Sequence, residues 1–133
     1  MKRRTFVKLA TATTVALYLP GLSCRSKESG FVTILSQPNF LQHICDAKTL
    51  HEIGEAYQHQ AKEEDNKTTL VKLLSTDSEG KPIDESADSS SVAAMLDQKI
   101  QMDFDQDKTV VVDGWVLSVT EARQCALYSL TEK

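Results

Sequence analysis

The sequence lacks the short motifs that mark common cofactor and catalytic sites. It contains no C-x-x-C-H haem motif, no glycine-rich phosphate-binding loop and no G-x-S-x-G nucleophile turn. His51 and Glu55 lie one helical turn apart, as in a zinc-binding helix, but no third ligand is obvious. Asp103, Asp105 and Asp107 alternate as in a calcium loop that lacks its central glycine and terminal glutamate. We therefore expect no cofactor, and we assign no catalytic or metal-binding residue.

Positive charge is scarce outside the first residues. The chain has 15 basic and 19 acidic residues, for a formal net charge of −4. Four of the basic residues and none of the acidic ones lie in residues 1–23, so residues 24–133 carry 11 basic and 19 acidic side chains, a net charge of −8. Nucleic acids and anionic lipid surfaces attract proteins through basic patches. The charge balance predicts that neither is a partner.

A hydrophobic run long enough for a permanent transmembrane helix, about 20 apolar residues, is also missing. The most apolar stretch, residues 7–22, is diluted by threonine and broken by Pro20 and Gly21. It follows three basic residues, which is the order of charge and apolar sequence in a secretory signal. We interpret residues 1–23 as a removable signal peptide.

Two segments of this signal resemble known export motifs. Residues 3–8, RRTFVK, resemble the twin-arginine consensus, with Arg3, Arg4, Phe6 and Lys8 at the characteristic positions. Residues 21–24, GLSC, resemble the lipoprotein processing box, in which the cysteine receives a lipid. The resemblance implies export and attachment by lipid at Cys24 to a membrane, in the periplasm or at the outer surface. The alternative is ordinary cleavage before a free Cys24.

Cysteine is rare, with three residues in the chain. If Cys24 carries a lipid, Cys45 and Cys125 remain as an even pair in an oxidising compartment. A disulfide between them would close a loop of about 80 residues and contribute about 4 kcal/mol. The alternative, which we favour, is that they are two buried thiols in separate helices.

The remaining length suits one small domain, because a chain of this size buries only about 65% of its unfolded surface. We expect residues 24–33 to be the anchor cysteine and a tether, and residues 34–133 to be a single helical domain. Apolar spacing predicts a series of helices. The first starts near Ser36, the second is capped by Asp46, the third covers residues 70–74, and a further one starts near Ser90. Residues 75–91 are polar and rich in turn formers, which predicts a mobile loop.

The C-terminal segment carries the strongest local signals. Two β-prone runs, residues 109–112 and 115–118, flank Asp113-Gly114, which suits a type I′ hairpin turn. Ser118 and Glu121 then fit a capping box that starts a last helix. The predicted fold is mainly α, with about five short helices and one β-hairpin near the C-terminus.

Trp115 is the only tryptophan of the chain. Beside a turn glycine it is expected to be a half-buried anchor of the hairpin. The alternative is that Trp115 and Leu117 contact a partner. The segment GWVLSVTEARQCAL also resembles a closing motif of small exported bacterial proteins with twin-arginine signals, and this resemblance implies no catalytic residue.

From these features we expect a non-catalytic lipoprotein of the cell envelope that acts as a binding or interaction module. The alternative follows from size and export route, which resemble those of the small signal-bearing subunits of membrane-bound flavin dehydrogenases acting on sugars or sugar acids. That resemblance implies an accessory subunit that supplies the export signal and membrane attachment for an exported oxidoreductase. A small metal-binding enzyme is the least favoured reading.

Overall fold

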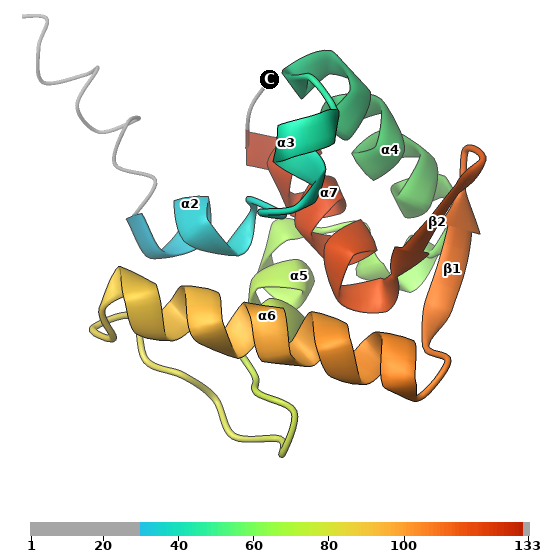
Figure 1. The fold of residues 1–133 in the computed structure, drawn as a ribbon. Helices are drawn as coiled ribbons and strands as arrows, with labels where there is room; N and C mark the ends of the chain where they lie inside the picture. The colour runs from blue at the N-terminus through green and yellow to red at the C-terminus, as the bar shows by residue number, and fades with distance from the viewer. Residues whose placement is uncertain (1–29, 132–133) are drawn as a thin grey trace, which may run out of the picture.

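The computed structural model describes residues 30–131, and the ribbon in Figure 1 is mainly helical with one β-hairpin, as predicted. The elements are α2 (Gly30–Leu35), α3 (Leu41–Ile44), α4 (Ala47–Gln60), the 3-10 turn η1 (Lys62–Glu64), α5 (Lys67–Leu74), α6 (Ser89–Asp105), β1 (Thr109–Val112), β2 (Trp115–Ser118) and α7 (Val119–Thr131). The export motif at residues 3–8 and the expected lipid anchor Cys24 lie outside the described residues.

Helix α7 lies at the centre of the fold, where α4, α5, α6 and the hairpin all pack against it. Its buried residues are Thr120, Glu121, Ala122, Gln124, Cys125, Ala126, Leu127 and Ser129. Cys125, expected to be a buried thiol, is among them.

Helices α4 and α7 meet at Gly54. A Cβ atom built on Gly54 would overlap the backbone carbonyl group of Cys125 and lie 2.9 Å from the Cβ of Ser129. Gln58, one turn further along α4, also hydrogen-bonds the hydroxyl of Ser129. Glycine lowers helix propensity, but here it lets two helix backbones approach without a side chain between them.

The start of the domain differs from the prediction. Ser36 does not cap a new helix, because it follows the end of α2 and its hydroxyl donates backwards to the Thr33 carbonyl at 2.9 Å. The next helix, α3, is a single turn. The expected tether also overlaps α2 at residues 30–33, where Phe31 and Leu35 lie four residues apart and are buried in the core. By contrast, Asp46 caps α4 as predicted, accepting from the Thr49 amide at 2.9 Å.

The hairpin and the helix that follows it match the prediction. Asp113 and Gly114 have φ angles of 52° and 87°, as a type I′ turn requires, and Val112 pairs with Trp115 across the turn. The capping box is complete. The Glu121 amide donates to the Ser118 hydroxyl at 3.0 Å, and the Ser118 amide donates to the Glu121 carboxylate at 3.1 Å. These contacts fix the angle between β2 and α7.

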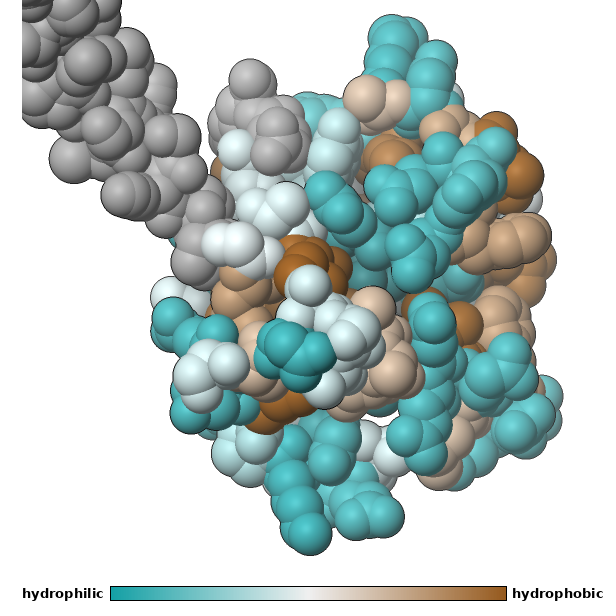
Figure 2. Space-filling view, turned by 60° about the vertical axis from the view of Figure 1, so that its left-hand side comes forward, coloured by the Kyte–Doolittle hydropathy of each residue, from teal (hydrophilic) through white to brown (hydrophobic). Residues whose placement is uncertain are grey.

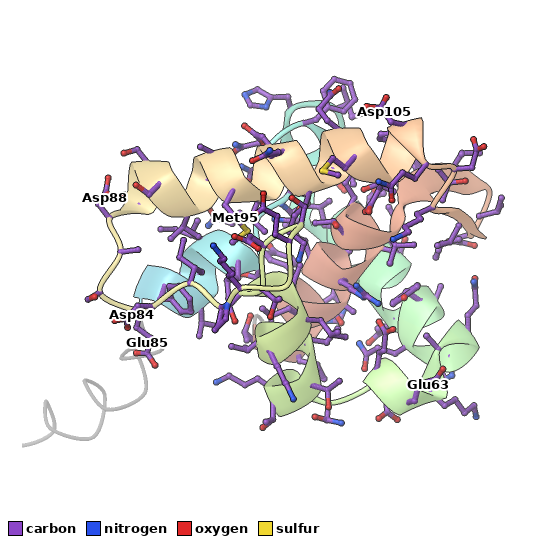
Figure 3. All side chains as sticks on the ribbon, turned by 90° about the horizontal axis from the view of Figure 1, so that it is seen from below. Glu63, Asp84, Glu85, Asp88, Met95 and Asp105 are labelled. Atoms are coloured by element: carbon purple, nitrogen blue, oxygen red, sulfur yellow. The ribbon has the colours of Figure 1, made fainter. Side chains whose placement is uncertain are left out.

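The segment between α5 and α6 is shorter than the predicted loop, because α6 already begins at Ser89. Within it, Asp77 accepts hydrogen bonds from two backbone amides, those of Glu79 and Lys81, both at 2.9 Å. The acidic residues Asp84, Glu85 and Asp88 lie at the outer edge of the segment and are exposed (Figure 3). The segment is therefore a series of turns with an acidic rim.

Candidate functional site

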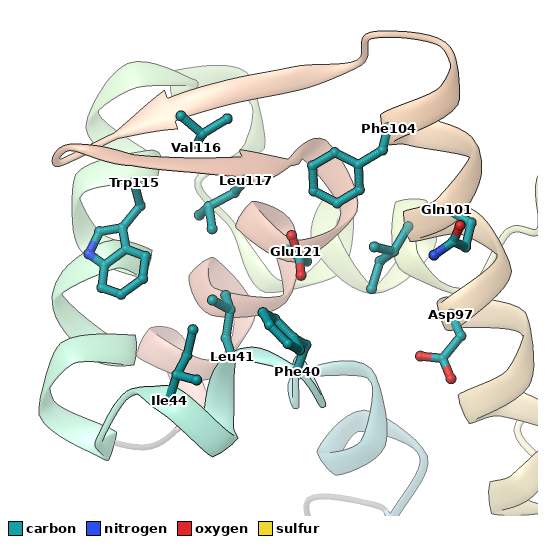
Figure 4. Close-up of a pocket in the computed structure, with 11 residues that line it drawn as sticks. Phe40, Leu41, Ile44, Asp97, Gln101, Phe104, Trp115, Val116, Leu117 and Glu121 are labelled. Carbon is teal, nitrogen blue, oxygen red and sulfur yellow. The ribbon is translucent and has the colours of Figure 1, made fainter.

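A groove of about 550 Å³ opens between α3, α6 and β2 (Figure 4). We call it the apolar groove. Phe40, Leu41 and Ile44 form one wall, at and just before α3, and Ile100 and Phe104 of α6 form the opposite wall. Residues 115–117 of β2 close its end. Three segments that are distant in the sequence therefore meet at one surface.

The walls of this groove expose hydrophobic side chains to an unusual degree. Phe40 is 67% exposed, Ile44 56%, Phe104 44% and Val116 64%. In residues 30–131, the one other large hydrophobic residue with comparable exposure is Val111, which pairs with Val116 across the hairpin. Single exposed hydrophobics are ordinary, but a contiguous group marks an interaction surface. On the face shown in Figure 2, brown hydrophobic side chains lie among hydrophilic ones.

The groove residues recur at helical spacing in the sequence. Phe40 and Ile44 are four residues apart, as are Ile100 and Phe104, which predicts that each pair shares an apolar helix face. Spacing by three and four shows that side chains share a face. It does not show whether another element covers that face, so the groove could not be found from the pattern.

The two residues predicted as partner contacts have different environments. Trp115 is half-buried, packs against the core and lines the groove (Figure 4), so its expected half-burial is confirmed. Leu117 is only 2% exposed and belongs to the core. Alternation along β2 turns its side chain inward, where it forms the base of the groove, and its contact with a partner stays a prediction.

The polar side chains that line the groove are those of Asp97, Gln101 and Glu121. Asp97 is exposed on its α6 side, and Glu121 is 4% exposed, with its carboxyl group directed toward the groove in Figure 4. Burial raises the pKa of Glu121, while its hydrogen bonds with Ser118 act in the opposite direction. Among the described residues that line the groove, there is no lysine, arginine or histidine. The site is therefore an apolar surface with two carboxyl groups.

A second polar feature joins η1 to α4 and α7. Arg123 donates from Nε and Nη2 to the two carboxylate oxygens of Glu64 at 2.8 and 3.0 Å, and the Tyr57 hydroxyl donates to Glu64 at 3.0 Å. The hydrogen bonds from Arg123 lower the pKa of Glu64. Burial and the nearby carboxylate raise the pKa of Tyr57 to about 12. This cluster is a structural clamp, since each of its groups has its partner within the fold.

The residues considered for metal binding do not form a site in residues 30–131, where no group of three or more potential ligands comes together. His51 faces Glu55 alone, with Nδ1 3.6 Å from the carboxylate. Asp103 accepts a hydrogen bond from the Thr120 amide at 2.8 Å, while Asp105 and Asp107 are exposed. The three aspartates thus have separate surroundings.

Cys45 and Cys125 are free thiols in this structure, so the disulfide considered for them is not formed. Cys125 is fully buried in α7, and Cys45 is half-buried at the end of α3. Burial raises the pKa of Cys125 to about 12. Its thiolate is therefore scarce at neutral pH, which argues against a nucleophilic role.

Two further findings concern membrane-spanning helices and similarity to known proteins. None of the helices in residues 30–131 has the combination of length and apolar character that crossing a membrane requires. Comparison of the sequence with protein-family models and curated proteins, and of the structure with solved structures, finds no match.

Proposed function

We propose that this protein is a non-catalytic binding module of the cell envelope, and that the apolar groove is its docking surface for a partner protein. The exposure of Phe40, Ile44, Phe104 and Val116 around one groove carries the proposal. Leaving such side chains in water costs about 25 cal/mol per Å² of apolar surface, which a bound partner would recover. The export and lipid-anchor motifs at residues 3–8 and 21–24 support the location.

The partner segment that fits this groove is an amphipathic segment with apolar anchors and at least one lysine or arginine. Its anchors would pack between Phe40 and Phe104, as in helix-in-groove recognition. Its positive charge would face Asp97 and Glu121, which meet no basic side chain along the groove. Charge complementarity of this kind gives specificity and speeds association.

The accessory-subunit function is a special case of the same proposal, in which the partner is an exported flavin dehydrogenase. The sequence supports it through the export signal, which would serve a complex that crosses the membrane folded. Recovery of a flavoprotein in constant ratio with the untagged protein would support this case. Recovery of the protein alone after gentle solubilisation would count against it.

The docking proposal can be tested with the intrinsic fluorescence of Trp115, the only tryptophan, which lines the groove. An amphipathic peptide bearing lysines should shift this fluorescence on binding to the full-length protein. A peptide with the same apolar face but glutamates instead should bind at least tenfold more weakly. Phe40→Ser combined with Ile44→Ser should reduce binding of the lysine peptide at least tenfold.

The matched control is Val111→Ser, which changes a similarly exposed residue, 61%, outside the groove. It should leave the affinity unchanged. Equal losses in the control and in the groove variant, or equal binding of both peptides, would contradict the proposed docking surface.

The location is tested by Cys24→Ser. If Cys24 carries the lipid, the variant should move from the membrane fraction to the soluble periplasmic fraction, because the acyl chains supply the membrane affinity at about 0.8 kcal/mol per buried methylene. Fractionation followed by immunoblotting measures this. Retention of the variant in the membrane fraction would show that something other than Cys24 is the anchor.

A further inference from the structure

A second cavity, of about 650 Å³, opens on a different face of α6. It lies between the end of α5, the start of the loop after it, α6 and the beginning of α7. Four cationic side chains line it: Lys72, Lys99, Lys108 and Arg123. We call it the cationic cavity. In a protein with an acidic excess, this local grouping of positive charge is an exception.

The two carboxylates that line the cavity, Asp77 and Asp103, accept hydrogen bonds from backbone amides. Asp103 accepts from the Thr120 amide at 2.8 Å. Asp77 accepts from backbone amides within its own turn. In residues 30–131, neither carboxylate lies within ion-pair distance of Lys72, Lys99 or Lys108. Within the described part of the chain, both carboxylates therefore bind backbone amides and form no ion pair with the three lysines.

Lys99 is the most enclosed of the three lysines. It is half-buried, and its Nζ donates to the backbone carbonyl of Leu73 at 2.7 Å. Burial and the charge of Arg123 lower the pKa of Lys99 to about 8, although Asp103 and Asp77 act in the opposite direction. Lys99 and Arg123 thus line the same cavity, and the charge of each opposes that of the other. An anion placed between them would relieve this repulsion.

Part of this arrangement has a purely structural explanation. Leu73 lies in the last turn of α5, where carbonyl groups lack helical partners, and an ammonium group there stabilises the helix end. This explains the position of Lys99. It does not explain Lys72 and Lys108, which converge on the same cavity from α5 and from the connection before β1.

We propose that the cationic cavity binds a small molecule bearing a phosphate group, with Lys72, Lys99 and Lys108 as its recognition residues. Lysine ammonium groups bind phosphate as mobile point charges. The cavity volume lies within the range of about 300 to 1,000 Å³ that is usual for small-ligand sites. The cationic cavity shares no lining residue with the apolar groove, so loss of binding at one site does not bear on the other.

The experiment titrates the full-length protein with inorganic phosphate and with pyrophosphate, against sodium chloride at equal ionic strength. The Lys99 side-chain resonance in NMR spectra reports the site directly. Phosphate should raise the pKa of Lys99 toward its ordinary value, because a bound anion favours the charged ammonium. It should also raise the melting temperature, since a ligand that binds only the folded state stabilises it.

Lys72→Gln combined with Lys108→Gln should weaken phosphate binding at least tenfold. Both side chains are exposed, and neither donates a hydrogen bond that holds the described fold together, so this double variant should remain folded. The matched control, Lys48→Gln combined with Lys81→Gln, removes the same charge outside the cavity and should bind as the unmodified protein does. An effect of phosphate no larger than that of chloride, or equal losses in the two double variants, would overturn the proposal.

Discussion

Gly54→Ala is expected to destabilise the protein by about 3 kcal/mol, although alanine is the better helix former. The new methyl group would overlap the carbonyl group of Cys125, and a backbone carbonyl in the centre of α7 cannot rotate away as a side chain can. Helices α4 and α7 would have to separate, which opens gaps in the core that they share. For a domain of about 100 residues, this corresponds to a melting temperature lower by roughly 12 to 24 °C.

The matched control is Gly30→Ala, because a Cβ atom on Gly30 meets no atom within 4 Å. Thermal unfolding followed by circular dichroism compares the two variants. Gly30→Ala should melt close to the unmodified protein. A Gly54→Ala variant that melts at or above the temperature of the unmodified protein would contradict the close crossing of α4 and α7.

Arg123→Met is expected to destabilise the protein by about 2 to 3 kcal/mol at pH 7, at or just below the range for breaking a buried ion pair, because both side chains are partly exposed. The side chains of Arg123 and Glu64 are 22% and 15% exposed. Removing the guanidinium leaves the Glu64 carboxylate enclosed with the Tyr57 hydroxyl as its remaining donor in the cluster. Methionine retains much of the apolar contact, so the loss reports mainly on charge.

The pH dependence identifies the cause. The pKa of Glu64 is lower in the folded protein than its ordinary value of 4.5. The ion pair therefore contributes fully above the unfolded-state pKa, and its contribution is lost as the pH falls through the folded-state pKa. The stability difference between Arg123→Met and the unmodified protein should shrink below about pH 4.5.

Urea unfolding at several pH values measures this difference. Lys48→Met is the control, because Lys48 forms an exposed ion pair with Glu52, and its urea midpoint should not change measurably. A loss on Arg123→Met that stays constant from pH 7 to pH 3 would show that packing, and not the Glu64 charge, is responsible.

Structural features that depend on residues close together in the sequence could be predicted from the sequence. The Asp113-Gly114 turn and the Ser118 and Glu121 capping box depend on residues no more than three apart, and both have the predicted geometry. The same is true of Asp46 as the cap of α4. The free energies that select these structures are local, since backbone conformation and short-range hydrogen bonds suffice.

Predictions failed where the decisive contact is distant in the sequence. Ser36 has the right chemistry for the predicted helix start, yet the chain turns there. Phe31 and Leu35 instead hold α2 on the core through contacts with α6. Local preference at residues 36–40 is weaker than the burial of two large side chains, so tertiary packing decided where the helix lies.

The sequence by itself determined a mainly helical domain with a C-terminal hairpin, and it determined the acidic charge. The tertiary structure alone decided which apolar side chains remain in water, because Phe40 and Phe104 carry the same periodic signal as residues of the core. It also decided that Gly54 is a contact between two helix backbones, and that Lys72, Lys99 and Lys108 meet at one cavity. Each of these depends on distances between segments that lie far apart in the chain, which no local pattern encodes.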